Sequence, residues 1–434
     1  MLFLSNSIKN LANHSLGKIL FFLLLILFTN KLSTSGFADY ILFLNLYSLS
    51  LLFSSVGIPQ YIIRTLSSRE NISYIKLFFN SIIFNIVLSL LFTFIIFFIL
   101  KIKFSFNHYF ILGFFIISAI NVTLISIFHG LSKVIYADFL DFLIKPIIIF
   151  IVIFFIYIFN NDLSFKLIFY AFLISQLCLF IILSITIFKK IPIIEFYNRD
   201  IVNNFDLSLF TKSIIFLGAT SFLHIFNSRV DIIMISKFLN KENLAIYGLT
   251  LQLVAILNFP IQAIRSIFHP NLYKFLSVKS YNLANDQLNL IRVGIIYYHI
   301  IILFFIFIFG FLVFPILFNE KYLLSLNLFI FYSFSNLLVI PFLMSEVVVH
   351  SFKKEKHIAF VTLISAILNI CFNIIFIPVY GIYAALFITL FCNLFVHVSL
   401  FCISKKLNNQ FSFIKISDFQ KFNDYMIYKF KEFK

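Results

Sequence analysis

Long apolar runs alternate with short polar segments along the whole chain. A helix needs about 20 predominantly apolar residues to cross the hydrocarbon core of a bilayer, and twelve runs reach that length. They cover residues 16–34, 40–63, 73–100, 106–129, 136–159, 165–188, 212–236, 243–267, 290–318, 322–350, 357–379 and 380–402. The pattern therefore predicts an all-α, polytopic membrane protein with twelve transmembrane helices.

The composition supports this class, because 62% of the residues are hydrophobic and only 12% are charged. A net charge of +16 would suggest a nucleic-acid partner in a soluble protein. In a membrane protein, the connections between successive spans lie on alternate sides of the membrane. Assigned in this way, 24 of the Lys and Arg residues lie on the side that holds both termini and 7 on the other side. The positive-inside tendency then predicts cytoplasmic termini, and no nucleic-acid partner is expected.

The two halves of the chain resemble each other. Residues 129–139 match residues 350–360 at an offset of 221, and residues 59–64 match residues 260–265 at an offset of 201. Because each half would hold six spans, both halves start in the cytoplasm and a pseudo-twofold axis runs along the membrane normal. We expect an N-terminal six-helix lobe (1–190), a cytoplasmic linker (191–211), a C-terminal lobe (212–402) and a basic cytoplasmic tail (403–434) suited to the anionic inner leaflet.

The seventh run contains two opposite charges, Arg229 and Asp231. A charge in hydrocarbon costs several kcal/mol unless it meets a partner or water, so such residues mark pathways. On a continuous helix the two side chains would point to nearly opposite sides, with Asp231 sharing a face with His224, Asn227 and Ser228. We expect them to face a cavity; the alternative is that each forms a structural pair with a neighbouring helix.

Other charges enter the spans from the cytoplasmic side. Asp141 and Lys145 are spaced to pair on one helix, either as a self-satisfied pair or as part of a cavity lining. Lys18 lies at the mouth of the first span. Arg64 and Arg265 lie at the cytoplasmic ends of spans two and eight, where ordinary positive-inside anchoring is the competing interpretation. Pro59 predicts a bend in span two, and no metal-ligand spacing, phosphate loop or nucleophile motif is present.

Four segments carry a family resemblance. They are Val230-Asp-Ile-Ile-Met-Ile235 with Phe238-Leu239 and Ala245-Ile-Tyr-Gly248, Gly36-Phe-Ala-Asp-Tyr40, Gly57 with Arg64, and Pro378-Val-Tyr-Gly381-Ile-Tyr-Ala-Ala385. In this order they resemble oligosaccharide flippases, the polysaccharide-transporter branch of the superfamily that also holds multidrug and toxin extrusion proteins and peptidoglycan-precursor lipid flippases. The chain departs from that pattern at residues 240–243, which lack the usual glycine.

The resemblance implies alternating-access translocation of a glycan on a polyprenyl diphosphate, such as undecaprenyl diphosphate, across the bacterial inner membrane. The product would serve O-antigen (lipopolysaccharide), capsule or exopolysaccharide biosynthesis, alongside a glycan polymerase and a chain-length regulator. Membrane lipids surround the protein, no cofactor or bound metal is expected, and Na⁺ or H⁺ is the candidate coupling ion. The cations assigned to the diphosphate are Arg229, Arg64, Arg265, Lys18 and Lys145, with Asp231, His224 and Asp141 as charge partners or coupling groups.

Two other functions compete with this interpretation. A cation-coupled multidrug exporter of the same fold should carry acidic residues deep in the first lobe, whereas the run 16–34 holds no Asp or Glu. A membrane glycan polymerase or ligase should carry a large extracytoplasmic loop with catalytic residues, whereas the predicted outer connections are short. We therefore expect a transporter and not an enzyme.

Overall fold

The computed structural model describes most of the chain as helix. The described residues are 2–55, 57–67, 74–99, 108–131, 133–160, 163–190, 211, 214, 218, 223, 226–258, 261, 275–276, 278–352 and 354–432. Within these residues all regular secondary structure is helical. The chain divides into two compact units, Met1–Arg229 and Val230–Lys434. This division falls inside the predicted seventh span, and the predicted linker, apart from residue 211, lies outside the described residues.

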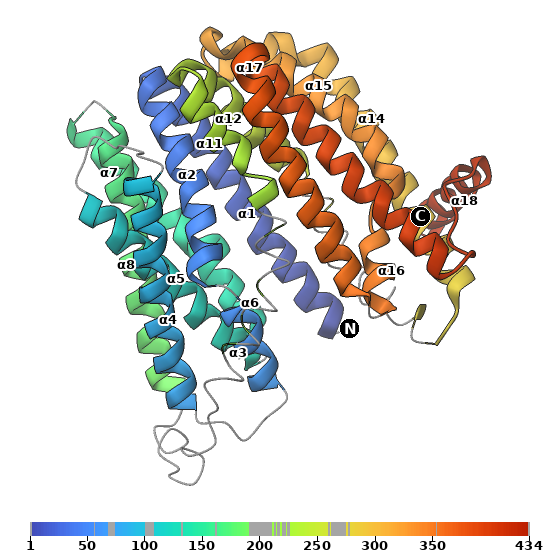
Figure 1. The fold of residues 1–434 in the computed structure, drawn as a ribbon, viewed down its shortest axis with the longest axis horizontal. Helices are drawn as coiled ribbons and strands as arrows, with labels where there is room; N and C mark the ends of the chain where they lie inside the picture. The colour runs from blue at the N-terminus through green and yellow to red at the C-terminus, as the bar shows by residue number, and fades with distance from the viewer. Residues whose placement is uncertain are drawn as a thin grey trace. The chain divides into compact units, whose positions relative to one another are not determined.

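The first unit contains the N-terminal helices, drawn from blue to green in Figure 1. They are α1 (Leu2–Lys31), α2 (Thr34–Ser54), α3 (Ile58–Ser67), α4 (Tyr74–Phe94), the π-helix η1 (Ile95–Ile99), α5 (His108–Gly130), α6 (Val134–Asp138), the π-helix η2 (Phe139–Ile144), α7 (Lys145–Asn160) and α8 (Phe165–Lys190). Aromatic rings join these helices in the interior. The ring centroid of Phe43 on α2 lies 5.1 Å from that of Phe114 on α5 and 5.3 Å from that of Phe169 on α8.

The second unit contains the remaining helices, which end with α18 in dark red (Figure 1). They are α11 (Val230–Phe238), α12 (Lys241–Leu257), α14 (Tyr281–Leu317), the 3-10 helix η4 (Glu320–Tyr322), α15 (Leu323–Val339), the 3-10 helix η5 (Ile340–Phe342), α16 (Ser345–Ser351), α17 (Glu355–Leu407) and α18 (Ile416–Glu432). Asn240 begins α12 without a glycine, because its side-chain oxygen accepts the backbone N–H of Asn243 at 2.9 Å. The departure from the family pattern at residues 240–243 therefore leaves a well-capped helix.

Nine helical segments of the described residues are long and apolar enough to cross a membrane. The last of them, Glu355–Leu407, consists of two arms that meet at Gly381, whose backbone has φ 64° and ψ −145°. These segments correspond to ten of the predicted spans. The other two, 212–236 and 243–267, contain α11 and α12 together with residues outside the described part of the chain. The predicted all-α, multi-pass membrane fold is confirmed.

The break after α2 differs from the prediction. A bend was expected at Pro59, but Pro59 is the second residue of α3, a position where proline's missing N–H costs nothing. The chain turns at Gly57 instead, which has φ 64°. A Cβ at this position would lie 2.0 Å from the carbonyl oxygen of Ile214. Glycine is required here both by the backbone angle and by the close approach of another segment.

The predicted basic tail contains a helix, residues 416–432, that packs on α14. The ring of Phe422 on α18 lies 5.6 Å from that of Tyr297 on α14. The helix α14 begins at Tyr281, before the predicted run 290–318, and so includes part of the connection that precedes that run. The basic tail is therefore a folded part of the second unit.

Candidate functional site

Arg229 lies in a turn and not in the middle of a helix. Residues 228–229 form this turn, and α11 begins immediately afterwards at Val230. The side-chain amide of Asn45, buried on α2, donates a hydrogen bond of 3.0 Å to the carbonyl oxygen of Arg229. The helix expected to run continuously through residues 212–236 is therefore interrupted at residues 228–229. The turn leaves the Arg229 side chain half-buried and its backbone fixed to α2.

A second cation lies near Arg229 within the first unit. Lys18 is half-buried on α1, close enough for its charge and that of Arg229 to repel each other. An anionic group of a substrate bound beside the two cations would reduce their mutual repulsion. An arginine and a lysine in this relation are suited to a diphosphate, since guanidinium donates two parallel hydrogen bonds and ammonium acts as a point charge.

Lys145 belongs to a different polar group. Its ammonium donates to the hydroxyl of Tyr47 at 3.0 Å and to the carboxylate of Asp141 at 3.4 Å. Gln176 also donates to the Tyr47 hydroxyl at 2.9 Å, and Asn121 donates to the Gln176 side-chain oxygen at 2.8 Å. The structure thus supports the self-satisfied pair for Asp141 and Lys145 and extends it to α2, α5 and α8. The roles of Tyr47, Gln176 and Asn121 were not predicted, because a single polar residue in an apolar run does not show which other residue it contacts.

Asp141 lies in the π-helix η2, which packs next to α1. A π-helical turn holds one residue more than an α-helical turn, so Asp141 is shifted by one position relative to a regular α-helix. Just before η2, Asp138 is buried, with one oxygen 3.0 Å from His129 Nε2 and the other 3.6 Å from His14 Nε2. The His14 ring lies over Phe142 with centroids 3.7 Å apart. Asp138 and Asp141 therefore both contact basic partners, in or next to a π-helical segment of a kind that is frequent at functional sites.

Gly17 allows α1 to approach η2 directly, because a Cβ there would lie 1.8 Å from the carbonyl oxygen of Phe142. We expect Gly17→Ala to force the two helices apart and to lower the free energy of unfolding by about 1–3 kcal/mol, as overpacking typically does. Thermal unfolding in detergent measures this change. Gly113→Ala is the control, since nothing lies within 4 Å of its Cβ position on α5. Equal melting temperatures for the two variants would contradict the close packing.

Asp231 is fully buried in the second unit. One carboxylate oxygen accepts the hydroxyl of Tyr247 on α12 and the hydroxyl of Thr389 on α17, the latter at 3.1 Å. The other oxygen accepts the backbone N–H of Ile232 at 2.9 Å. The expected cavity-facing position is not what the structure has, since hydroxyl groups from two neighbouring helices enclose the carboxylate. This arrangement stabilises a charged oxygen through directed donors.

Three of the predicted site residues cannot be placed with their side chains. His224 and Arg265 lie outside the described residues, and Arg64 is on α3 with a side chain that also lies outside them. Among the residues that the structure describes, no group of three His, Cys, Asp or Glu side chains is arranged to hold a metal ion. The described site residues therefore have different partners: Arg229 is held by Asn45, Lys145 contacts Tyr47 and Asp141, and Asp231 accepts from Tyr247 and Thr389.

Comparison of the sequence with protein-family models finds a match over residues 3–270 to a family described as "Polysaccharide biosynthesis protein". No curated protein matches the sequence.

Several solved structures have the same fold. The lipid II flippase MurJ in an inward closed conformation has a TM-score of 0.66 and 17% identity, covering 96% of this chain and 90% of that chain. An inward-facing multidrug resistance MATE family transporter of the MOP superfamily has a TM-score of 0.63 and 13% identity, covering 93% of each chain. A MOP superfamily transporter from Pyrococcus furiosus, with a binding pocket of reversed polarity, has a TM-score of 0.62 and 13% identity, covering 92% of this chain and 94% of that chain.

Proposed function

Because the chain belongs to the polysaccharide biosynthesis protein family, we propose that it is a flippase for lipid-linked oligosaccharides. Its substrate is a glycan unit on a polyprenyl diphosphate, which it moves from the cytoplasmic to the outer leaflet of the bacterial inner membrane. The fold, which is that of MOP superfamily transporters, supports alternating access as the mechanism. The MurJ structure, described as a lipid II flippase, is a precedent for a lipid-linked substrate on this fold.

The observation that carries this proposal is the pair of half-buried cations, Arg229 and Lys18. A diphosphate between them would offset their mutual repulsion, while the polyprenyl chain remains in the bilayer. Asp138 and Asp141 of the same unit each contact a basic partner, His129 and Lys145 respectively. These contacts favour an anionic substrate over the cationic drug of a multidrug exporter.

We assign ion coupling to Asp231. Its carboxylate is buried among hydroxyl donors from α12 and α17, so a change in its charge would alter contacts between three helices. A proton bound to the carboxylate, or Na⁺ bound to its oxygens, would each cause such a change. His224 and Asp141 remain secondary candidates for the same role.

The proposed topology places both termini in the cytoplasm and the released glycan at the outer face of the inner membrane. A glycan polymerase and a chain-length regulator would then act on the translocated units. The protein itself would form and break no covalent bond, so a role as polymerase or ligase is not proposed.

Reconstitution of the purified protein in liposomes tests this function. We expect a polyprenyl-diphosphate-linked oligosaccharide placed in the inner leaflet to become accessible to an external lectin, and a cationic dye in the lumen to be retained. Efflux of the dye driven by an ion gradient, without glycan movement, would instead identify a multidrug exporter. Lengthening of the glycan would identify a polymerase.

A further inference from the structure

The membrane helix predicted at residues 322–350 is broken near its cytoplasmic end. Between α15 and α16 lie the 3-10 turn η5 and Met344, whose φ of 64° and ψ of 5° place it in the left-handed region. This conformation is strained for a residue with a Cβ. A break also frees backbone groups that water cannot reach within a membrane. The surroundings of Met344 must therefore hold the break in place.

Arg292 on α14 provides the polar part of that support. Its side chain is 2% exposed, so the guanidinium is enclosed by protein. Nε donates to the carbonyl oxygen of Leu343 and Nη2 donates to the hydroxyl of Ser345, each at 3.0 Å. These two acceptors stand immediately before and after Met344. The guanidinium reaches these two acceptors with separate nitrogens, Nε and Nη2, and keeps Nη1 for a third acceptor.

The guanidinium is linked in turn to the C-terminal helix. Arg292 Nη1 donates to the side-chain oxygen of Asn289 at 3.1 Å, and the Asn289 amide donates to a carboxylate oxygen of Asp418 on α18, also at 3.1 Å. Asp418 is buried and accepts the backbone N–H of Lys415 at 2.9 Å, which orients it at the start of α18. A continuous chain of hydrogen bonds therefore runs from α18 through α14 to the break.

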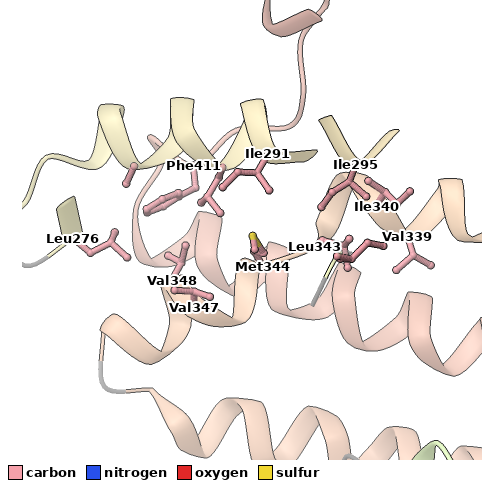
Figure 2. Close-up of a cluster of buried hydrophobic side chains, with 13 residues drawn as sticks. Leu276, Ile291, Ile295, Val339, Ile340, Leu343, Met344, Val347, Val348 and Phe411 are labelled. Atoms are coloured by element: carbon pink, nitrogen blue, oxygen red, sulfur yellow. The ribbon is translucent and has the colours of Figure 1, made fainter. Parts of the chain in front are cut away.

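Apolar packing encloses the break on its other sides. Figure 2 shows Met344 lying between α14, which contributes Ile291 and Ile295, and α16, which contributes Val347 and Val348. Met344 itself is fully buried. Water is thus excluded around the break, and the hydrogen bonds from Arg292 have no solvent substitute.

We propose that Arg292 is a positioning residue of the transport cycle and that α18 holds it in place through Asp418 and Asn289. In this arrangement the C-terminal helix sets the left-handed turn at Met344 and with it the angle between α15 and α16. Release of α18 frees Asn289 and Arg292 and lets the break relax. The effect on transport rests on the proposed function, whereas the effect on the break does not.

Hydrogen–deuterium exchange of the full-length protein in nanodiscs measures the break directly. Asp418→Ala should speed amide exchange across residues 340–351 by about ten-fold, because the chain of hydrogen bonds loses its anchor while the cores remain. Asp424→Ala is the matched control, since Asp424 is exposed on the same helix. Exchange in α8 of the first unit should not change in either variant.

A second substitution separates this role from general destabilisation. Asparagine at position 418 keeps an oxygen that can accept both donors, because the Asn289 amide and the Lys415 N–H bind the same carboxylate oxygen of Asp418. Asp418→Asn should therefore keep exchange across residues 340–351 slow, and glycan translocation should fall several-fold in Asp418→Ala but not in Asp418→Asn. Faster exchange confined to α18, or equally fast exchange across residues 340–351 in both variants, would overturn the proposal. If the wild-type protein moves no glycan, the proposed function fails while the exchange result still decides the role of Arg292.

Discussion

Replacement of Arg229 by alanine should reduce glycan translocation by about 10²-fold while the protein remains inserted and folded. A charge-assisted hydrogen bond is worth about 1.5–3 kcal/mol, and a guanidinium can donate two of them to a diphosphate. The turn at residue 229 should persist, because the hydrogen bond from Asn45 goes to the backbone carbonyl, which alanine keeps. Translocation in liposomes and thermal unfolding measure the two effects separately.

Two further variants sharpen this experiment. Arg229→Lys should recover part of the activity, since it retains the charge but not the two-pronged geometry. Lys237→Ala removes an exposed cation at the end of α11 and should leave translocation unchanged. Wild-type translocation by Arg229→Ala would exclude the anion-binding role, and an equal loss in Lys237→Ala would indicate a general effect of positive charge.

Replacement of Asp231 by asparagine should abolish the dependence of transport on an ion gradient. Asparagine has nearly the same shape, but it does not titrate. It has a single side-chain oxygen, which can accept either from the Tyr247 and Thr389 hydroxyls or from the Ile232 N–H, whereas the carboxylate of Asp231 accepts from both sides. We therefore also expect a loss of about 1–3 kcal/mol in the free energy of unfolding, from the donors left unpaired. Transport assayed with imposed proton and sodium gradients, alongside thermal unfolding, measures both effects.

Tyr247→Phe is the matched control for this position. It removes one hydroxyl donor to Asp231 and keeps the carboxylate, so it should cost stability without abolishing the response to the gradient. If Asp231→Asn keeps the wild-type gradient dependence, the carboxylate has only the structural role that the sequence already allowed as an alternative.

The apolar runs were sufficient to predict the class of fold, because hydrocarbon leaves a backbone almost no alternative to helix. The family match also confirms the resemblance seen in four short segments. Helix breaks were harder to predict. Pro59 suggested a bend, but the chain turns at Gly57. The break at Met344 has a left-handed residue that is not glycine, so no local signal in the sequence indicated it. A break stabilised by another helix depends on packing, which local residue preferences do not contain.

The sequence predicted several residues of the candidate site, but not how they are arranged in space. Charges within apolar runs drew attention to Arg229, Asp231 and Lys145, but their surroundings come from helices far away in the sequence. Arg292 lies at the start of the predicted run 290–318, and nothing in the neighbouring sequence indicated that it would be 2% exposed. Its burial depends on α17 and α18, which lie far along the chain.

The π-helix from Phe139 to Ile144 has an evolutionary consequence. A π-helical segment contains one residue more than the α-helical turn that it replaces, and one residue corresponds to a rotation of about 100°. All of α7 is thereby rotated relative to α6, and this rotation brings Lys145 to Tyr47. Insertion or deletion of a single residue in this segment would therefore rotate α7, and a deletion should separate Lys145 from Tyr47.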